Sequence, residues 1–222
     1  MPVKAPPNLS AVPAPYSWSG CYVGAHAGVA WAKTKWTNTA DTSLFGDLVP
    51  GDSLSKSGSG LVGGGQVGCN YQINAFVFGL EGTLAASTID DSVTNTTFGA
   101  ADDIFTTRIN GIATVVGRIG YAWNNWLIYA KGGYAGANVK LGVSDTVAPN
   151  KGSGSATNWH SGWTVGGGIE LGLSPHWIVG IDYSYMDLQT INDNVAGGSD
   201  GVYRFDVRPR IQQAVVRLSY KF

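Results

Sequence analysis

The sequence has few charged residues and lacks any long apolar run. Charged residues make up 13% of the 222 residues, about half the ~25% typical of soluble domains, so a fully water-exposed surface is a poor fit. The 14 basic and 15 acidic residues leave a formal charge of -1, which provides no electrostatic footprint for nucleic acid. Glycines, amides or charges break every apolar run before the roughly 17 residues that a membrane-spanning helix needs. We therefore expect neither nucleic-acid binding nor a transmembrane helix.

Signatures of catalysis and of cofactor binding are also scarce. The three histidines do not cluster with cysteines or acids, so we expect no metal site. The glycine run at 61–65 is followed by neither Gly-Lys-Ser/Thr nor a helix, which excludes a phosphate loop. His160 and Ser161 are adjacent, and adjacent strand residues point to opposite faces, so direct proton transfer between them is awkward. We predict no enzymatic activity and no cofactor.

Glycine is abundant, at 32 residues, and the dominant pattern is an alternation with a period of two residues. On both sides of Ser174-Pro175-His176, apolar residues alternate with small or charged ones, as in a hairpin. The same period predicts eight strands, at about 20–35, 58–72, 76–88, 107–123, 126–142, 161–174, 177–190 and 208–222. Short connections alternate with long ones at about 36–57, 89–106, 143–160 and 191–207. This alternation is typical of outer-membrane barrels.

The first 15 residues differ in composition from the rest of the chain. They are rich in proline and alanine, with five prolines, and proline prevents regular strand pairing. We expect a flexible arm over 1–15 on the periplasmic side, leading into one barrel domain over 16–222. The arm has no apolar stretch long enough for a signal peptide, so we expect any export signal to have been removed.

The two strand faces differ in a way that separates a membrane barrel from a soluble one. In the predicted third strand, Phe76, Phe78 and Leu80 share one face, whereas Gly79 and Glu81 share the other. A soluble barrel places its apolar side chains inside. Here the charged face belongs inside, so lipid must surround the apolar face. The predicted fold is all-β, an eight-stranded antiparallel up-and-down transmembrane β-barrel in the bacterial outer membrane.

Each predicted strand carries a polar residue five positions inward from its short-turn end. That position lies roughly 13 Å deep, near the middle of an apolar band about 25 Å tall. A lipid-facing Arg or Lys there would cost about 2 to 4 kcal/mol, so these residues must face the lumen. The predicted lumen polar network is His26, Gln66, Glu81, Arg118, Lys131, Glu170, Asp182 and Arg217. Its three acids and three bases balance, as a desolvated network requires.

Aromatic residues and cysteines mark the short-turn side. A belt of aromatic side chains is expected there, at the membrane interface. The predicted belt is Trp18, Tyr71, Phe76, Trp123, Trp126 and Trp177. Cys21 and Cys69 lie near the short-turn ends of adjacent strands with the same outward parity, in a compartment expected to be oxidising. Both a disulfide and a pair of free, lipid-facing thiols are consistent with this placement.

Three segments of the chain resemble a known family. These are YSWSGCYVGAHAGVAWA, WNNWLIYAKGGYAGA and VVRLSYKF, and they resemble the small porin-like surface proteins of alphaproteobacteria called outer-membrane immunogenic proteins. The resemblance spans about 16–222. Phe222, with Tyr220 two residues before it, resembles the C-terminal signal recognised by the outer-membrane assembly machinery. The resemblance implies an OmpA-like eight-stranded barrel with roles in envelope integrity, surface exposure and host interaction, and carries over no enzymatic site.

The partners follow from this location and resemblance. We expect contact with outer-membrane lipids and lipopolysaccharide, with the assembly machinery and with a host or surface ligand, whose identity the sequence leaves open along with the oligomeric state. The predicted function is that of a structural barrel whose long loops face outward. The alternative is a narrow porin-like channel with Glu81, Arg118, Lys131 and Glu170 at its constriction, although eight strands leave an interior just wide enough for side chains. A lumen that is hydrophilic from end to end would indicate the channel.

Overall fold

The computed structural model describes residues 16–38, 53–94, 103–145, 153–197 and 201–222. The predicted arm over 1–15 lies outside these residues. The strands are β1 (Gly20–Asn38), β2 (Ser53–Ile73), β3 (Phe76–Thr94), β4 (Asp103–Trp123), β5 (Trp126–Asp145), β6 (Ser153–Gly172), β7 (Trp177–Leu188), β8 (Ile191–Gly197) and β9 (Gly201–Lys221). No helix among the described residues is long and apolar enough to cross a membrane.

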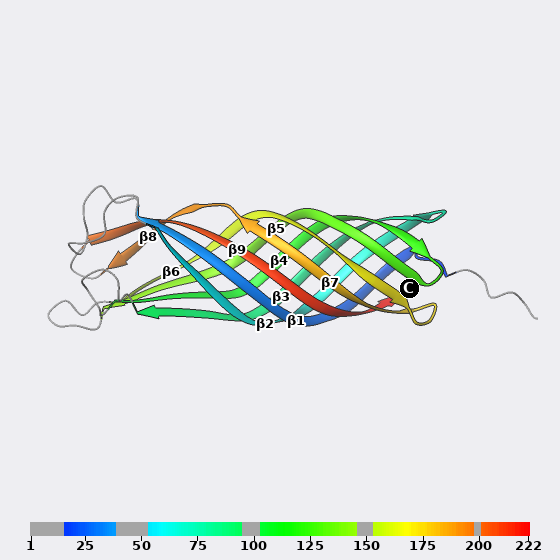
Figure 1. Ribbon diagram of the computed structural model, residues 1–222, viewed down its shortest axis with the longest axis horizontal. Coiled ribbons are helices and arrows are strands. Elements are labelled where there is room, and N and C mark those ends of the chain that lie inside the picture. The colour runs from blue at the N-terminus through cyan, green and yellow to red at the C-terminus, as the bar shows by residue number, and fades with distance from the viewer. Residues whose placement is uncertain (1–15, 39–52, 95–102, 146–152, 198–200) are drawn as a thin grey trace, which may run out of the picture.

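The strands form one closed, antiparallel barrel (Figure 1). From β1 to β7 each strand pairs with the next in the sequence, β7 pairs with β9, and β9 pairs with β1 to close the sheet. β7 and β8 pair with successive parts of β9, on either side of a two-residue break at Gln189 and Thr190. They therefore occupy one position in the wall, which confirms the predicted eight-stranded antiparallel barrel.

The strands extend further toward the long loops than the sequence predicted. β2 begins at Ser53 rather than at about 58, β3 ends at Thr94 rather than at about 88, and β6 begins at Ser153 rather than at about 161. The predicted long loops are thus partly strand. The alternation weakens in these polar segments, but the hydrogen-bonded ladder connects backbone groups and does not require apolar side chains. The prediction from the alternation of residue types therefore made these strands too short.

Tight turns connect the strands at the opposite end. Asn74 and Asn124 adopt a left-handed backbone conformation, each with φ of 54°, which asparagine tolerates better than most residues. The flanking pairs Ile73–Phe76 and Trp123–Trp126 close two-residue hairpins. The third short connection spans 173–176, where the backbone N–H of Trp177 donates to Ser174 Oγ at 3.2 Å. All three lie where the sequence predicted them.

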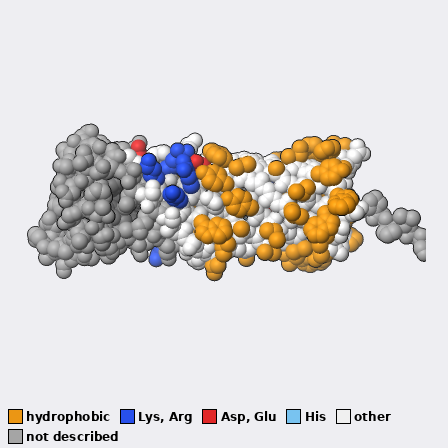
Figure 2. All heavy atoms as spheres, in the orientation of Figure 1, with side chains coloured by type: hydrophobic (Ala, Val, Ile, Leu, Met, Phe, Trp, Pro, Cys, Tyr) orange, Lys and Arg blue, Asp and Glu red, His pale blue; other side chains and the backbone are white. Residues whose placement is uncertain are grey.

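The exterior is apolar over the part of the barrel nearest the short turns. The predicted lipid-facing residues Phe76, Leu80, Leu84 and Ile181 are between 52% and 71% exposed, and Figure 2 shows apolar side chains spread over this part of the face that it draws. Glycine allows neighbouring strands to approach each other closely within the wall. At Gly64 a Cβ would collide with the backbone of Leu84 and Ala85 on the paired strand β3, so only glycine permits this close approach.

Candidate functional site: the interior of the barrel

All eight residues predicted to form the lumen polar network lie in the interior. They are between 1% and 9% exposed, and each comes from a different strand of the wall, β1 to β7 and β9. The two-residue period explains this placement, because a residue shares its face with the residues two positions before and after it. The structure divides the eight into a cluster of six charged groups and a separate neutral pair.

Glu81 is the centre of the charged cluster. Its carboxylate accepts hydrogen bonds from Arg118 Nη1 at 3.1 Å and from both Nη atoms of Arg217. Arg118 also donates through Nη2 to Glu170 Oε2 at 2.8 Å. The Glu81 carboxylate is thus shared between the guanidinium groups of Arg118 and Arg217. Glu170 provides Arg118 with a second carboxylate.

Asp182 forms the second half of the cluster. It accepts a hydrogen bond from Lys131 Nζ at 2.7 Å, and Arg217 Nη1 lies 3.5 Å from its other oxygen. Arg217 also lies 3.8 Å from Glu170. The six charged groups therefore form one connected network, in which each cation contacts at least one carboxylate and each carboxylate at least one cation.

Two tyrosines that the sequence analysis did not identify complete this network. Tyr22 donates to Glu81 at 2.6 Å and accepts from Arg118 at 2.7 Å. Tyr129 donates to Asp182 at 2.6 Å, and the guanidinium carbon of Arg118 lies 3.9 Å from the centre of its ring. Both share the inward parity of the predicted residues on their own strands, which is the signal that could have identified them.

His26 and Gln66 form the neutral pair. His26 Nδ1 lies 2.7 Å from Gln66 Oε1, and Gln66 Nε2 donates to Ser219 Oγ at 3.1 Å. The eight residues predicted as one lumen polar network therefore form two groups. Strands in a barrel are staggered along the axis, so equal counts from the strand ends do not give equal depths.

Apolar layers lie within the barrel on both sides of the charged cluster. Toward the short turns, Trp18, Val77, Leu127, Tyr129 and Ile178 pack together. Toward the long loops lies a larger group, consisting of Ala30, Ala32, Val62, Ile89, Ile109, Ile112, Ala135, Ala137, Val139, Met186, Leu188, Ile211 and Val215. The described interior is thus not hydrophilic from end to end.

Trp18 corrects the predicted aromatic belt. It is 0% exposed and lies inside the barrel, whereas the other five predicted residues, Tyr71, Phe76, Trp123, Trp126 and Trp177, are 46% to 71% exposed on the outside. Trp18 precedes β1, so strand alternation does not determine its direction. Its backbone N–H donates to Gln72 Oε1 at 2.7 Å, and its ring packs edge-on against Tyr16. Tyr16 and Trp18 thus fill the short-turn end of the barrel.

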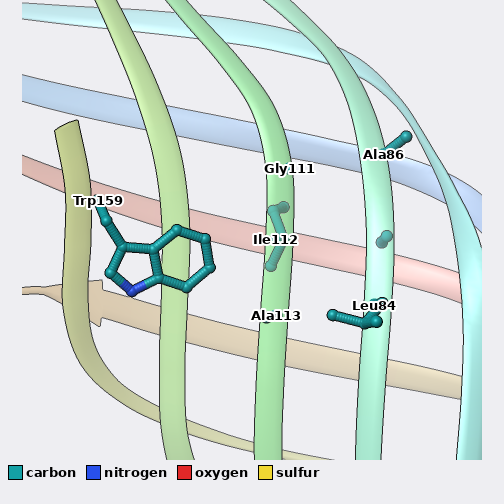
Figure 3. Close-up of a pocket in the computed structure, with 7 residues that line it drawn as sticks. Leu84, Ala86, Gly111, Ile112, Ala113 and Trp159 are labelled. Carbon is teal, nitrogen blue, oxygen red and sulfur yellow. The ribbon is translucent and has the colours of Figure 1, made fainter. Parts of the chain in front are cut away.

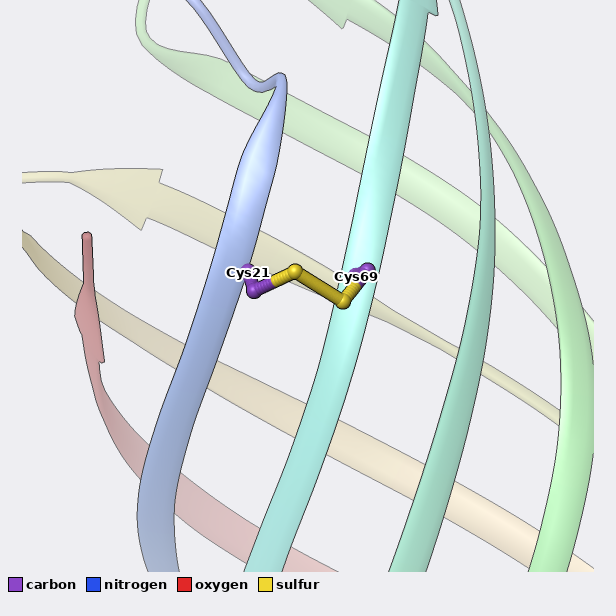
Figure 4. The surroundings of a disulfide bond; sticks show 2 residues. All are labelled: Cys21 and Cys69. Carbon is purple, nitrogen blue, oxygen red and sulfur yellow. A yellow bond between two sulfur atoms is a disulfide. The ribbon is translucent and has the colours of Figure 1, made fainter.

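Cys21 and Cys69 form a disulfide on the outer face (Figure 4). They lie directly opposite each other in the pairing of β1 with β2, and their Cα atoms are 3.9 Å apart. Of the two states that the sequence left open, the structure has the bridge. It joins the first two strands of the barrel near the short turns.

A shallow apolar hollow lies in the barrel wall where the strand register shifts (Figure 3). The shifts occur between Ala86 and Ile89 on β3 and between Ile109 and Gly111 on β4. The hollow is lined by Leu84, Ala85, Ala86, Gly111, Ile112, Ala113 and Trp159. Its lining contains no acid, base or nucleophile, so it provides no catalytic chemistry.

His160 and Ser161 lie on opposite sides of the wall. His160 is 0% exposed in the interior, whereas Ser161 Oγ lies 2.9 Å from the hydroxyl of exposed Tyr134. Because the two side chains lie on opposite sides of the wall, a proton cannot pass directly from one to the other. Among the described residues, no group of three or more His, Cys, Asp or Glu side chains could hold a metal ion.

Comparisons with known proteins agree with this architecture. The family model described as outer membrane protein beta-barrel domain matches residues 9–222. A 31 kDa outer-membrane immunogenic protein of Brucella melitensis biotype 1 is 31% identical over 78% of this chain and 72% of its own length. A 22 kDa outer membrane protein of Rhizobium leguminosarum bv. viciae is 34% identical over 82% of this chain and 70% of its own length.

Among solved structures, the chain shares its fold with the outer membrane protein OprG from Pseudomonas aeruginosa. The TM-score is 0.57 and the identity 15%, over 93% of this chain and 98% of that one. The outer membrane protease OmpT from Escherichia coli gives a TM-score of 0.54 at 7% identity, over 93% of this chain and 98% of that one. These likenesses show the fold alone, and together with the sequence relatives they confirm the family and the outer-membrane location predicted above.

Proposed function

Because the chain belongs to the outer membrane beta-barrel domain family, we propose that it is a structural, non-enzymatic barrel that maintains the integrity of the outer membrane and presents its long-loop end to the surroundings. The observation that carries this proposal is the composition of the interior, in which a neutralised charged cluster lies between two apolar layers. The family includes relatives named outer-membrane immunogenic proteins, which supports surface exposure.

The charged cluster favours a structural role because its charges neutralise one another. The cations Arg118, Lys131 and Arg217 face three carboxylates, and their side chains are at most 5% exposed. Removing one member of such a buried pair leaves an uncompensated charge and is strongly destabilising. An ion that crossed this level would have to separate the same pairs, so the network resists passage.

The apolar layers add two further barriers to a water-filled path. The layer toward the long loops includes Ala30, Met186 and Ile211, each 0% exposed. At the end of this layer nearer the long loops its position has a physical reason, since the outward residues there are polar, as at Lys33 and Arg210 beside Ala32 and Ile211. Here the outside of the barrel is water or headgroups, so the apolar side chains turn inward, as in a soluble protein.

The proposal is tested in cells that lack the gene. We expect them to be more sensitive to detergent and to release periplasmic protein, and we expect the wild-type gene to restore the barrier. A Lys131→Met, Asp182→Leu variant should restore it equally, because replacing a buried ion pair with apolar residues of similar size is often neutral or stabilising. A variant that assembles at wild-type levels but restores nothing would indicate that these charges act on a solute, as in the channel alternative.

A further inference from the structure

Four basic side chains lie together on the outer surface of the barrel, and we call them the outer basic cluster. They are Lys33 and Lys35 of β1 and Arg208 and Arg210 of β9, all exposed. The pairing of the two strands places Lys33 opposite Arg210 and Lys35 opposite Arg208. The four side chains line a shallow hollow together with Ser55 of β2. Figure 2 shows Lys and Arg side chains gathered between the apolar band and the long-loop end.

This arrangement has an excess of positive charge. Like charges directly opposite each other on neighbouring strands destabilise a sheet. Asp187 of β7 pairs with both arginines: Arg208 Nε and Nη2 donate to its two oxygens at 2.9 Å each, and Arg210 Nε lies 3.4 Å away. Even with Asp206 of β9 included, cations outnumber carboxylates among the described residues of this surface. The cluster is therefore suited to an anionic ligand.

Asp187 also fixes the direction of the guanidinium groups. Its side chain is 8% exposed, whereas those of Arg208 and Arg210 are 46% and 48% exposed. The carboxylate thus holds one edge of Arg208 against the wall, and the rest of the group faces outward. A planar guanidinium held in this way is well suited to bidentate binding of phosphate.

The cluster lies at the border of the apolar band. On β1, Trp31 lies two residues nearer the short turns than Lys33. It is 46% exposed and faces outward. Next to β9 at the same level, the hydroxyl of exposed Tyr183 donates to Gln212 at 2.9 Å. Amphipathic aromatic side chains mark the headgroup level of a membrane, and outer-membrane barrels direct their long loops outward. The cluster is thus at the headgroup level of the outer leaflet.

From this placement we infer that the outer basic cluster binds the phosphate groups of a phosphorylated glycolipid in the outer leaflet, the chemical class that includes lipopolysaccharide. The cluster faces sideways from the wall beside the apolar band, where a lipid can place acyl chains and headgroup together. A polyanion that approached from the surrounding water would contact the cations but would make no use of the adjacent apolar band. The inference rests on the outer-membrane location and orientation of the barrel and is independent of whether its lumen is closed.

The test uses the refolded full chain in detergent micelles, titrated with bisphosphorylated lipid A and with its dephosphorylated form. We expect tighter binding of the phosphorylated form to the wild type. A Lys33→Gln, Lys35→Gln variant should bind it about 10- to 30-fold more weakly, because each cation near an anionic headgroup contributes roughly a factor of five. This variant leaves the Asp187 ion pairs intact, and heat-dependent migration in a gel checks that it is folded.

The matched control is Arg108→Gln, Lys140→Gln, which removes two exposed cations that lie opposite each other on β4 and β5. We expect it to change the affinity less than threefold. Equal affinity of the wild type and the lysine variant would overturn the inference, and so would equal losses in both double variants, which would indicate attraction by general charge. Lysine-dependent binding of heparin without binding of lipid A would also overturn it and would indicate an external polyanion.

Discussion

Replacing Glu81 with glutamine removes the carboxylate on which both buried arginines converge. The Glu81 side chain is 0% exposed, and its partners Arg118 and Arg217 are 1% and 4% exposed. In the Glu81→Gln variant, Arg118 keeps Glu170 at 2.8 Å, and Arg217 keeps Asp182 at 3.5 Å. The cluster nevertheless changes from neutral to one uncompensated positive charge in a desolvated interior.

The expected cost is that of breaking one buried ion pair, about 3–5 kcal/mol. With a urea dependence of about 2 kcal/mol per M, the unfolding midpoint should fall by about 2 M. The assay is equilibrium unfolding of the refolded protein in lipid vesicles, followed by tryptophan fluorescence. The control is Lys140→Gln, which changes one exposed charge and should stay within about 0.5 kcal/mol of the wild type.

A double-mutant cycle tests the cause of this loss. Arg217→Met alone should also destabilise the barrel, and the combined Glu81→Gln, Arg217→Met variant should be more stable than the two separate losses predict, by about 1–3 kcal/mol. Additive losses would refute the reasoning, as would a Glu81→Gln variant within 1 kcal/mol of the wild type, because the charges would then not compensate one another.

Three further predictions concern the short-turn end of the barrel. Replacing Cys21 and Cys69 with serine should cost about 2–4 kcal/mol in the same urea assay, because their bridge spans 48 residues and restricts the unfolded chain; labelling of two thiols in the unreduced, unfolded wild type would refute this. Trp18→Ala should cost about 3–5 kcal/mol, since it empties a fully buried site, and a loss below 1 kcal/mol would contradict the proposed packing. Phe222→Ala should lower the amount assembled in cells while changing the stability of the refolded protein by at most about 0.5 kcal/mol, because this residue is 73% exposed; unchanged assembly, measured by surface labelling, would exclude its role as an assembly signal.

The period of two residues made the direction of most side chains predictable. It placed Glu81 inside and Leu80 outside, because neighbouring strand residues point to opposite faces. It did not predict that Glu81 on β3 meets Arg217 on β9, which is 136 residues away, since such contacts depend on how the strands are staggered around the barrel. Trp18 was misplaced because it precedes the first strand, where the alternation does not apply.

The apolar layer toward the long loops was missed for a different reason. Ala32 and Ile211 share the inward face of their strands with polar residues nearer the short turns, His26 on β1 and Arg217 on β9. The prediction took one environment for the outside of the whole barrel, but the strands extend beyond the apolar band, and there β1 and β9 have apolar residues inside and basic residues outside. A change in the character of the two faces along one strand is the signal that would have located this boundary.

The most direct test of the closed interior is the conductance of the refolded wild-type protein in a planar lipid bilayer, recorded beside the Lys131→Met, Asp182→Leu variant. The neutralised cluster and the two apolar layers predict that neither protein gives steady current, although both insert and are folded. Steady current through the wild type, with an ion selectivity that changes in the variant, would contradict the structural account and establish the cluster as the constriction of a channel.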